Sequence, residues 1–80
     1  MSEPKFDFMT MLKKTEGREY EMPEVLTMEK LQPMFDSISK DGNEDSLLNL
    51  ITLCANYESK SANEAERLLE AMTFVRSVTE

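Results

Sequence analysis

The sequence contains no histidine and no tryptophan, and its 80 residues include one cysteine, two glycines and three prolines. Without histidine, and with a single thiol and no recognisable group of paired carboxylates, it lacks the residues that usually perform acid–base, nucleophilic or zinc chemistry. We therefore expect a protein that is not an enzyme and that holds no metal ion and no cofactor. Because glycine and proline are scarce while 40% of the residues are hydrophobic, we predict a folded, mainly helical chain.

Long apolar runs are also missing. No run approaches 18 residues, and the Met-Ser-Glu-Pro start lacks the basic segment and apolar core of a secretion signal. The single cysteine, Cys54, has no partner for an internal disulfide and is expected to be a small buried apolar residue. These features predict a soluble protein without membrane contact, located in the cytoplasm, or in the host cytoplasm if the source is viral.

Basic residues are few: nine lysines and arginines stand against 16 acidic residues, which gives a formal net charge of -7. Such a charge repels phosphate backbones and anionic lipid head groups, so direct nucleic-acid binding is not expected. An acidic surface is compatible with simple solubility, with binding of a basic protein, or with imitation of DNA towards a DNA-binding protein.

Length sets the scale of the fold. A chain of 80 residues makes one domain (1–80) with a thin margin of stability, which leaves self-association or support from a partner open. The first five residues are expected to be flexible. Three helices are predicted, at 28–39, 45–58 and 61–79, and the short link between the last two predicts an antiparallel helical hairpin.

The stretch from Asp45 to Tyr57 is the predicted centre of the fold. Its polar interior positions form one narrow stripe, and apolar residues fill the remaining directions of the helical wheel. A helix of this kind must be covered on most sides. Asp45 is expected to cap its start, where a negative charge also suits the helix dipole.

The helices on either side are amphipathic. In 28–39 the apolar positions are Met28, Leu31, Phe35 and Ile38, with a bend expected near Pro33. The sequence Ser61-Ala-Asn-Glu64 is a capping box at the start of the last helix. The inward face of that helix is predicted to comprise Ala65, Leu68, Leu69, Met72 and Val75. Phe74 points away from that face, so it either contacts a partner or is covered by the amino-terminal segment.

The amino-terminal region permits two interpretations. Residues 18–22 alternate in polarity after Gly17, which is typical of a short β-hairpin pairing residues 6–12 with 18–22. The stretch from Phe6 to Leu12 also fits a short helix with Met9 and Leu12 facing inward.

Two local patterns suggest a bound group. Asp45-Ser46-Leu47 resembles the attachment site of acyl and peptidyl carrier proteins, in which the serine holds a phosphopantetheine arm. Here, however, Gly42 stands three residues before the aspartate instead of the usual two, and the acidic recognition positions are absent. Ser37 to Leu48 resembles a calcium loop, but its twelfth position, which should supply a bidentate glutamate, is Leu48.

A further resemblance covers about half of the chain. Gly17 to Leu31 reads Gly-Arg-Glu-Tyr-Glu-Met-Pro-Glu-Val-Leu-Thr-Met-Glu-Lys-Leu, a short strand that leads through an acidic turn into a helix, with further helices after it. This arrangement is similar to small tail assembly chaperones of tailed phages. The resemblance implies a non-structural helper that binds the tape-measure protein or tail-tube subunits and shields apolar segments. It carries no catalytic residues.

We therefore predict a non-enzymatic, acidic, helical protein-binding protein, most specifically an assembly chaperone or adaptor of phage type. One alternative is an acidic inhibitor or DNA mimic that blocks a basic surface of a host protein. The other is an acyl carrier-like protein modified on Ser46. The predicted partner-binding surface lies on the outer side of the last helix and consists of Phe74, Val78, Glu66 and Glu70.

Overall fold

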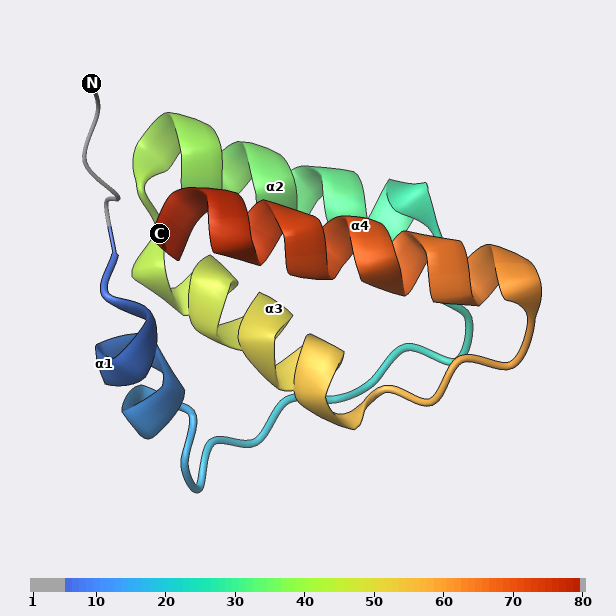
Figure 1. Cartoon of the computed structure of the whole chain (residues 1–80), viewed down its shortest axis with the longest axis horizontal. Helices are drawn as coiled ribbons and strands as arrows, with labels where there is room; N and C mark the ends of the chain where they lie inside the picture. Colours follow the sequence, from blue (N-terminus) through green and yellow to red (C-terminus); the bar gives the residue numbers. More distant parts are fainter. Residues whose placement is uncertain (1–5, 80) are drawn as a thin grey trace.

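A computed structural model describes residues 6–79 and shows a mainly helical domain, as predicted. The expectation of flexibility for residues 1–5 lies outside the described residues. The helices are α1 (Phe8–Lys14), α2 (Met28–Asp41), α3 (Glu44–Asn56) and α4 (Ala62–Thr79). Figure 1 shows α4 running beside α2 and antiparallel to α3, while α1 lies next to the start of α3. Of the four, α3 contacts all the others.

The core of the domain is centred on α3, in agreement with its apolar circumference. Six of its residues are buried, namely Leu47, Leu48, Leu50, Ile51, Thr52 and Leu53. They share one core with Leu31 and Ile38 of α2 and with Ala71 and Val75 of α4. Each fully buried leucine or isoleucine of this core contributes about 1.5–3 kcal/mol to folding.

The amino-terminal region forms a helix, and the β-hairpin interpretation is wrong for the described residues, which contain no strand. Asp7 begins α1, because its carboxylate accepts a hydrogen bond from the Thr10 backbone N–H at 2.9 Å. The inward face is also corrected: Met11 is the buried residue of α1, while Met9 is 61% and Leu12 39% exposed. A capped helical turn that covers α3 with one methionine is therefore preferred to a two-stranded ribbon, which is marginally stable by itself.

Helix α2 continues to Asp41, two residues beyond the predicted end. Gly42 adopts a left-handed conformation, with φ 64°, and its N–H donates to the Ile38 carbonyl oxygen at 3.0 Å, which closes the last turn. The helix runs through Pro33 without interruption. Its predicted apolar face is confirmed: Leu31 and Ile38 are buried, and Met28 and Phe35 are half-buried against the core.

Helix α4 begins where predicted, but the face that it buries is not the predicted one. Leu69 is 63% and Met72 45% exposed, and Ala65 is exposed as well. The residues that α4 turns inward are Glu64, Leu68, Ala71, Phe74, Val75, Val78 and Thr79. The reason is that α4 contacts both α2 and α3, so its buried arc faces the space between two helices.

Candidate protein-binding surface

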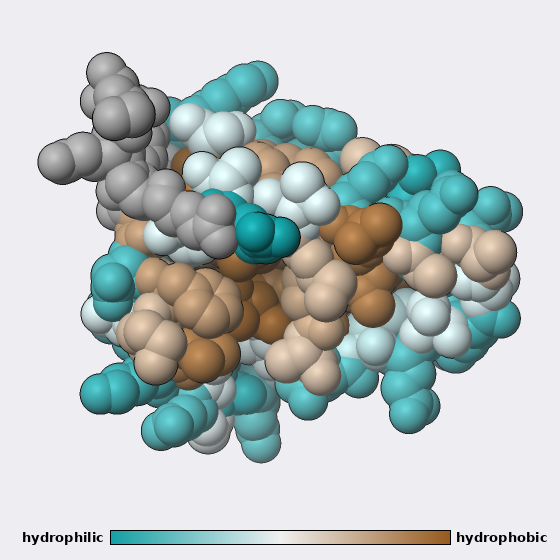
Figure 2. Space-filling model, viewed as in Figure 1, coloured by the Kyte–Doolittle hydropathy of each residue, from teal (hydrophilic) through white to brown (hydrophobic). Residues whose placement is uncertain are grey.

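An apolar groove lies between α1, α3 and α4. It has a volume of about 310 Å³ and is lined by Phe8, Leu12, Ile51, Cys54, Ala55, Met72, Val75 and Arg76. In the space-filling view, brown and tan side chains form a band that runs from α1 across the middle of the molecule to α4 (Figure 2). Arg76 is the only charged residue of this lining.

The wall contributed by α4 is a regular stripe. Ala65, Leu69, Met72 and Arg76 are all exposed, and they follow one another at intervals of four, three and four residues. At 3.6 residues per turn, this spacing places them on one side of the helix. We call these four residues the α4 stripe. Leu69 and Ala65 extend the apolar wall beyond Met72 by about two turns.

The floor of the groove comes from the second half of α3. Ile51 is buried, Cys54 is half-buried and Ala55 is exposed. Cys54 is therefore less buried than its surroundings in the sequence suggested, and its thiol lines the groove. Burial nevertheless raises the pKa of Cys54 to about 11, so the thiol is protonated and weakly nucleophilic near neutral pH.

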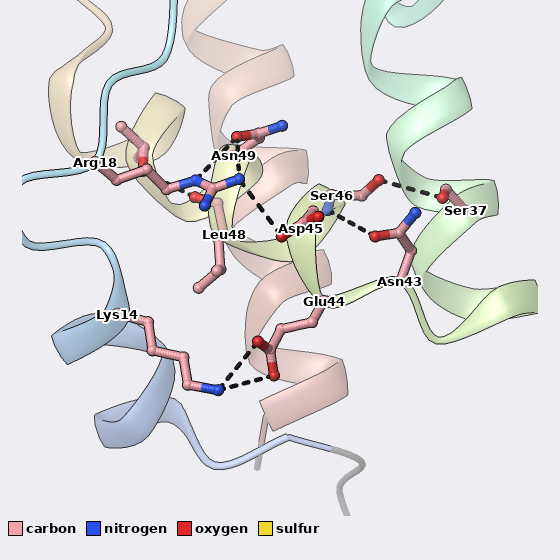
Figure 3. Close-up of polar contacts among 10 residues, drawn as sticks. Lys14, Arg18, Ser37, Asn43, Glu44, Asp45, Ser46, Leu48 and Asn49 are labelled. Atoms are coloured by element: carbon pink, nitrogen blue, oxygen red, sulfur yellow. Dashed lines mark hydrogen bonds and ion pairs between the residues drawn. The ribbon is translucent and has the colours of Figure 1, made fainter.

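The third wall is α1, which presents Phe8 and Leu12 at 40% and 39% exposure. Polar contacts attach this short helix and the following loop to α3. Lys14 Nζ lies 3.0 Å from Glu44 Oε2, and the Arg18 guanidinium donates to Asn49 Oδ1 at 3.0 and 3.2 Å (Figure 3). Together with the burial of Met11, these contacts hold α1 so that Phe8 and Leu12 line the groove.

The structure divides the four residues that were predicted to bind a partner. Phe74 stacks on Phe35 of α2, with ring centroids 4.4 Å apart and an interplanar angle of 22°. The Val78 carbonyl oxygen accepts a hydrogen bond from the Phe6 N–H at 3.3 Å, and both side chains pack on the core. The sequence predicted that Phe74 is covered either by a partner or by the amino-terminal segment, whereas in the structure its ring packs against α2.

Glu66 and Glu70, in contrast, are exposed on the outer side of α4, as predicted. Glu70 pairs with Arg67, whose Nη1 lies 3.2 Å from its Oε1. Glu66 immediately follows Ala65 and stands one turn before Leu69, so it flanks the α4 stripe. The lining of the groove therefore contains neither the predicted acidic residues nor the predicted apolar ones.

Ser46 lies at the interface between α2 and α3. Its Oγ is 3.2 Å from Ser37 Oγ, and its backbone N–H donates to Asn43 Oδ1 at 3.2 Å (Figure 3). Asn43 is therefore the N-cap of α3, and the prediction that Asp45 caps it is wrong. Asp45 is instead exposed in the first turn, 3.8 Å from Arg18 Nη2. These contacts explain the Asp-Ser pair without an attached group.

Glu64 is buried, although the sequence predicted only its part in a capping box. Ser61 Oγ accepts from the Glu64 N–H at 3.2 Å, as predicted, but the Glu64 carboxylate accepts from the backbone N–H groups of Lys60 at 2.7 Å and Leu26 at 3.2 Å. The bond from Lys60 is the main cause that lowers the pKa of Glu64 and outweighs its burial. Glu64 therefore connects the loop before α2 to the start of α4.

The Tyr57 hydroxyl lies in the same cluster and donates to the Glu24 carbonyl oxygen at 3.4 Å. Burial, with a smaller contribution from the Glu64 carboxylate, raises the pKa of Tyr57. Every polar group here has a partner within the fold, and no buried side-chain nitrogen or oxygen in residues 6–79 lacks one. The hydrogen bonds of this cluster therefore join the loop before α2, the end of α3 and the start of α4.

No family model, curated protein or solved structure matches the chain. Within the described part of the chain, no group of three or more histidine, cysteine, aspartate or glutamate residues is placed to hold a metal ion. Over the same residues, no helix is both long enough and apolar enough to cross a membrane. The groove between α1, α3 and α4, lined mainly by apolar side chains, is therefore the candidate binding surface.

Proposed function

We infer that this protein is a non-enzymatic binding protein that holds another protein on the groove between α1, α3 and α4. The observation that supports this most is the convergence of exposed apolar side chains from three helices on one groove: Phe8 and Leu12 of α1, Ala55 of α3 and Met72 of α4. Isolated exposed apolar residues are common, but a contiguous apolar surface with a polar rim is typical of an interaction site.

The composition of the surface favours an adaptable binder. Met72 lines the groove with a flexible, polarisable side chain that adjusts to differently shaped partners, as a chaperone or adaptor requires. The resemblance of Gly17 to Leu31 to small phage tail assembly chaperones favours the same class. In this form of the proposal, the chain shields apolar segments of a phage tail protein during assembly.

The test is capture of a partner from the native source with tagged wild-type protein and with the double variant Leu69→Gln/Met72→Gln. Glutamine forms helix well and is polar, so the variant should fold normally while losing apolar contact area. We expect the captured partner to fall by about tenfold or more, since two central contacts are removed. Val25→Gln is the matched control, because Val25 is 53% exposed and lies away from the groove.

Equal capture by wild-type and double-variant protein, with unchanged circular dichroism, would show that the groove is not the binding surface. The acidic-inhibitor alternative is supported by the net charge of -7 and by the exposure of Glu66 and Glu70. That alternative predicts a complex that dissociates in about 1 M salt, at which exposed charges are screened within about 3 Å. A complex held in the apolar groove should persist in that salt.

A further inference from the structure

Residues 19–25, in the connection between α1 and α2, form an irregular segment that we call the strap. Figure 1 shows this connection passing the end of α3 before it reaches the start of α2. Within the described residues, no backbone–backbone hydrogen bond involves the strap. Such a segment lacks the cooperative backbone bonding that stabilises a helix. It therefore depends on its side chains and on the contacts at its two ends.

The strap covers the core loosely. Tyr20 and Met22 are half-buried against the core, while the glutamates that alternate with them are exposed. A cleft of about 360 Å³, with room for several water molecules, lies between the strap, α2 and α3, and the core residues Leu31 and Leu53 line it. Because the strap leaves this space unfilled, lifting it breaks fewer contacts than separating two packed helices does.

One fastening lies at the carboxyl end of the strap. The Leu26 N–H donates to Glu64 Oε2 at 3.2 Å, and the Glu24 carbonyl oxygen accepts from Lys60 Nζ at 2.8 Å. Leu26 and Glu64 are both buried, so water competes little for the bond between them. This fastening ties the strap to the start of α4.

The other fastening is Arg18, which directly precedes the strap. Its half-buried guanidinium donates two hydrogen bonds to Asn49 Oδ1 of α3 (Figure 3). Bonds from a charged donor are stronger than those between neutral groups, so Arg18 fixes this end more firmly than a neutral side chain does. The strap is thus fixed at both ends and held weakly between them.

We propose that the strap is a lid that opens while the four helices stay folded, and that the Glu64 and Arg18 fastenings set how often it opens. Opening uncovers Leu31 and Leu53. This side of the core is separate from the groove, because the groove lining contains no residue of the strap or of α2. The inference therefore does not depend on the proposed function.

The test is digestion of the full chain by a protease that cuts after glutamate, with the fragments followed by mass spectrometry. Glu19, Glu21 and Glu24 are exposed sites in the strap, and Glu66 and Glu70 are exposed sites in α4. Cleavage of a native protein follows the population of the locally opened form, and a helix is cut only after it unfolds. Cleavage in the strap should therefore be at least about tenfold faster than cleavage in α4.

Two variants weaken the fastenings. Glu64→Gln keeps an acceptor for the capping bond from Lys60, because glutamine also serves in a capping box, but its single amide oxygen cannot accept from Leu26 as well. Arg18→Gln removes the guanidinium. Each should speed cleavage of the strap by about fivefold or more, since a hydrogen bond to a charged group is lost. Lys14→Gln, which breaks only the exposed pair with Glu44, should change it by less than about twofold.

Gly42→Ala distinguishes local opening from unfolding of the whole domain. It lowers the stability of the fold at a position outside the strap, so cleavage in α4 should rise by about fivefold while cleavage in the strap stays within about twofold. An equal rise at both places would overturn the inference, because the strap would then open only when the domain unfolds. Unchanged strap cleavage in Glu64→Gln or in Arg18→Gln, with circular dichroism like that of the wild type, would overturn it as well.

Discussion

Replacement of Phe74 by alanine is the sharpest test of how α4 packs. The sequence predicted that this residue contacts either a partner or the amino-terminal segment, whereas in the structure its ring stacks on Phe35 at a centroid distance of 4.4 Å. Removing a fully buried phenylalanine side chain costs about 3–5 kcal/mol, and stacking contributes about 0.5–1.5 kcal/mol beyond the buried area. Because Phe74 is half-buried, we expect Phe74→Ala to lower the free energy of unfolding by about 2–3 kcal/mol.

That loss is large for a domain of this size. At about 0.05–0.15 kcal/mol per residue, 80 residues have a total stability of about 4–12 kcal/mol. Since about 1 kcal/mol shifts the Tm of such a domain by about 4–8 °C, the melting temperature should fall by roughly 10–20 °C. Thermal and urea unfolding followed by circular dichroism measure both quantities. Leu69→Ala is the matched control on the same helix, and it should change stability by less than about 0.5 kcal/mol because Leu69 is 63% exposed.

A double-mutant cycle isolates the ring contact. Phe35→Leu, Phe74→Leu and the double variant should give a coupling free energy of about 0.5–1.5 kcal/mol. A coupling of zero would refute the stacking. If Phe74→Ala melts within about 3 °C of the wild type but loses partner binding, Phe74 is a surface contact and the described packing of α4 against α2 is wrong.

Two titratable residues and one glycine provide further tests. The pKa of Glu64 is lowered from its ordinary value of 4.5, so its contribution to stability is present above pH 4.5 and is lost as the pH falls through the folded-state pKa. The melting temperature should therefore fall below about pH 4.5, and it should fall less steeply in Glu64→Gln. Cys54 should react slowly with iodoacetamide at pH 7.5, and its rate should keep rising up to about pH 11, whereas a rate that levels off near pH 9, the ordinary pKa of a thiol, would contradict its burial. Gly42→Ala should cost about 1 kcal/mol in urea unfolding, because φ of 64° strains a residue with a Cβ.

The helices could be predicted because their signals are local. The apolar circumference of 45–57 requires burial whatever its neighbours are, and Ser61 caps α4 through a hydrogen bond within the same turn. The left-handed glycine at 42 likewise ends α2 through contacts made within that helix. Element type and approximate bounds therefore follow from short stretches of sequence.

The orientation of α4 could not be predicted because two apolar stripes overlap on it. One contains Leu69 and Met72, the other contains Ala71 and Phe74, and Val75 can belong to either. The 3.6-residue period permits both, so the choice depends on which helices lie nearby. Contact with α2 through Phe35 selects the second stripe and leaves the first in solvent.

The groove was not predictable for a related reason. Its lining combines the consecutive helices α3 and α4 with α1, which is distant in the sequence and fitted both a strand and a helix. Glu66 and Glu70 are exposed, but neither lines the groove. A sequence signal did exist, since α4 has more apolar surface than one neighbouring helix can cover, but that signal indicates a second contact without identifying it.

The two stripes of α4 separate stability from binding. Polar replacement of an exposed residue such as Leu69 should change the free energy of unfolding by less than about 0.5 kcal/mol, while truncation of Phe74 should cost several times more. The fold therefore does not require an apolar residue at Leu69 or Met72, and glutamine there would be tolerated. Exposed apolar side chains that the fold does not need are the ones to which the proposed function assigns the contact with another protein.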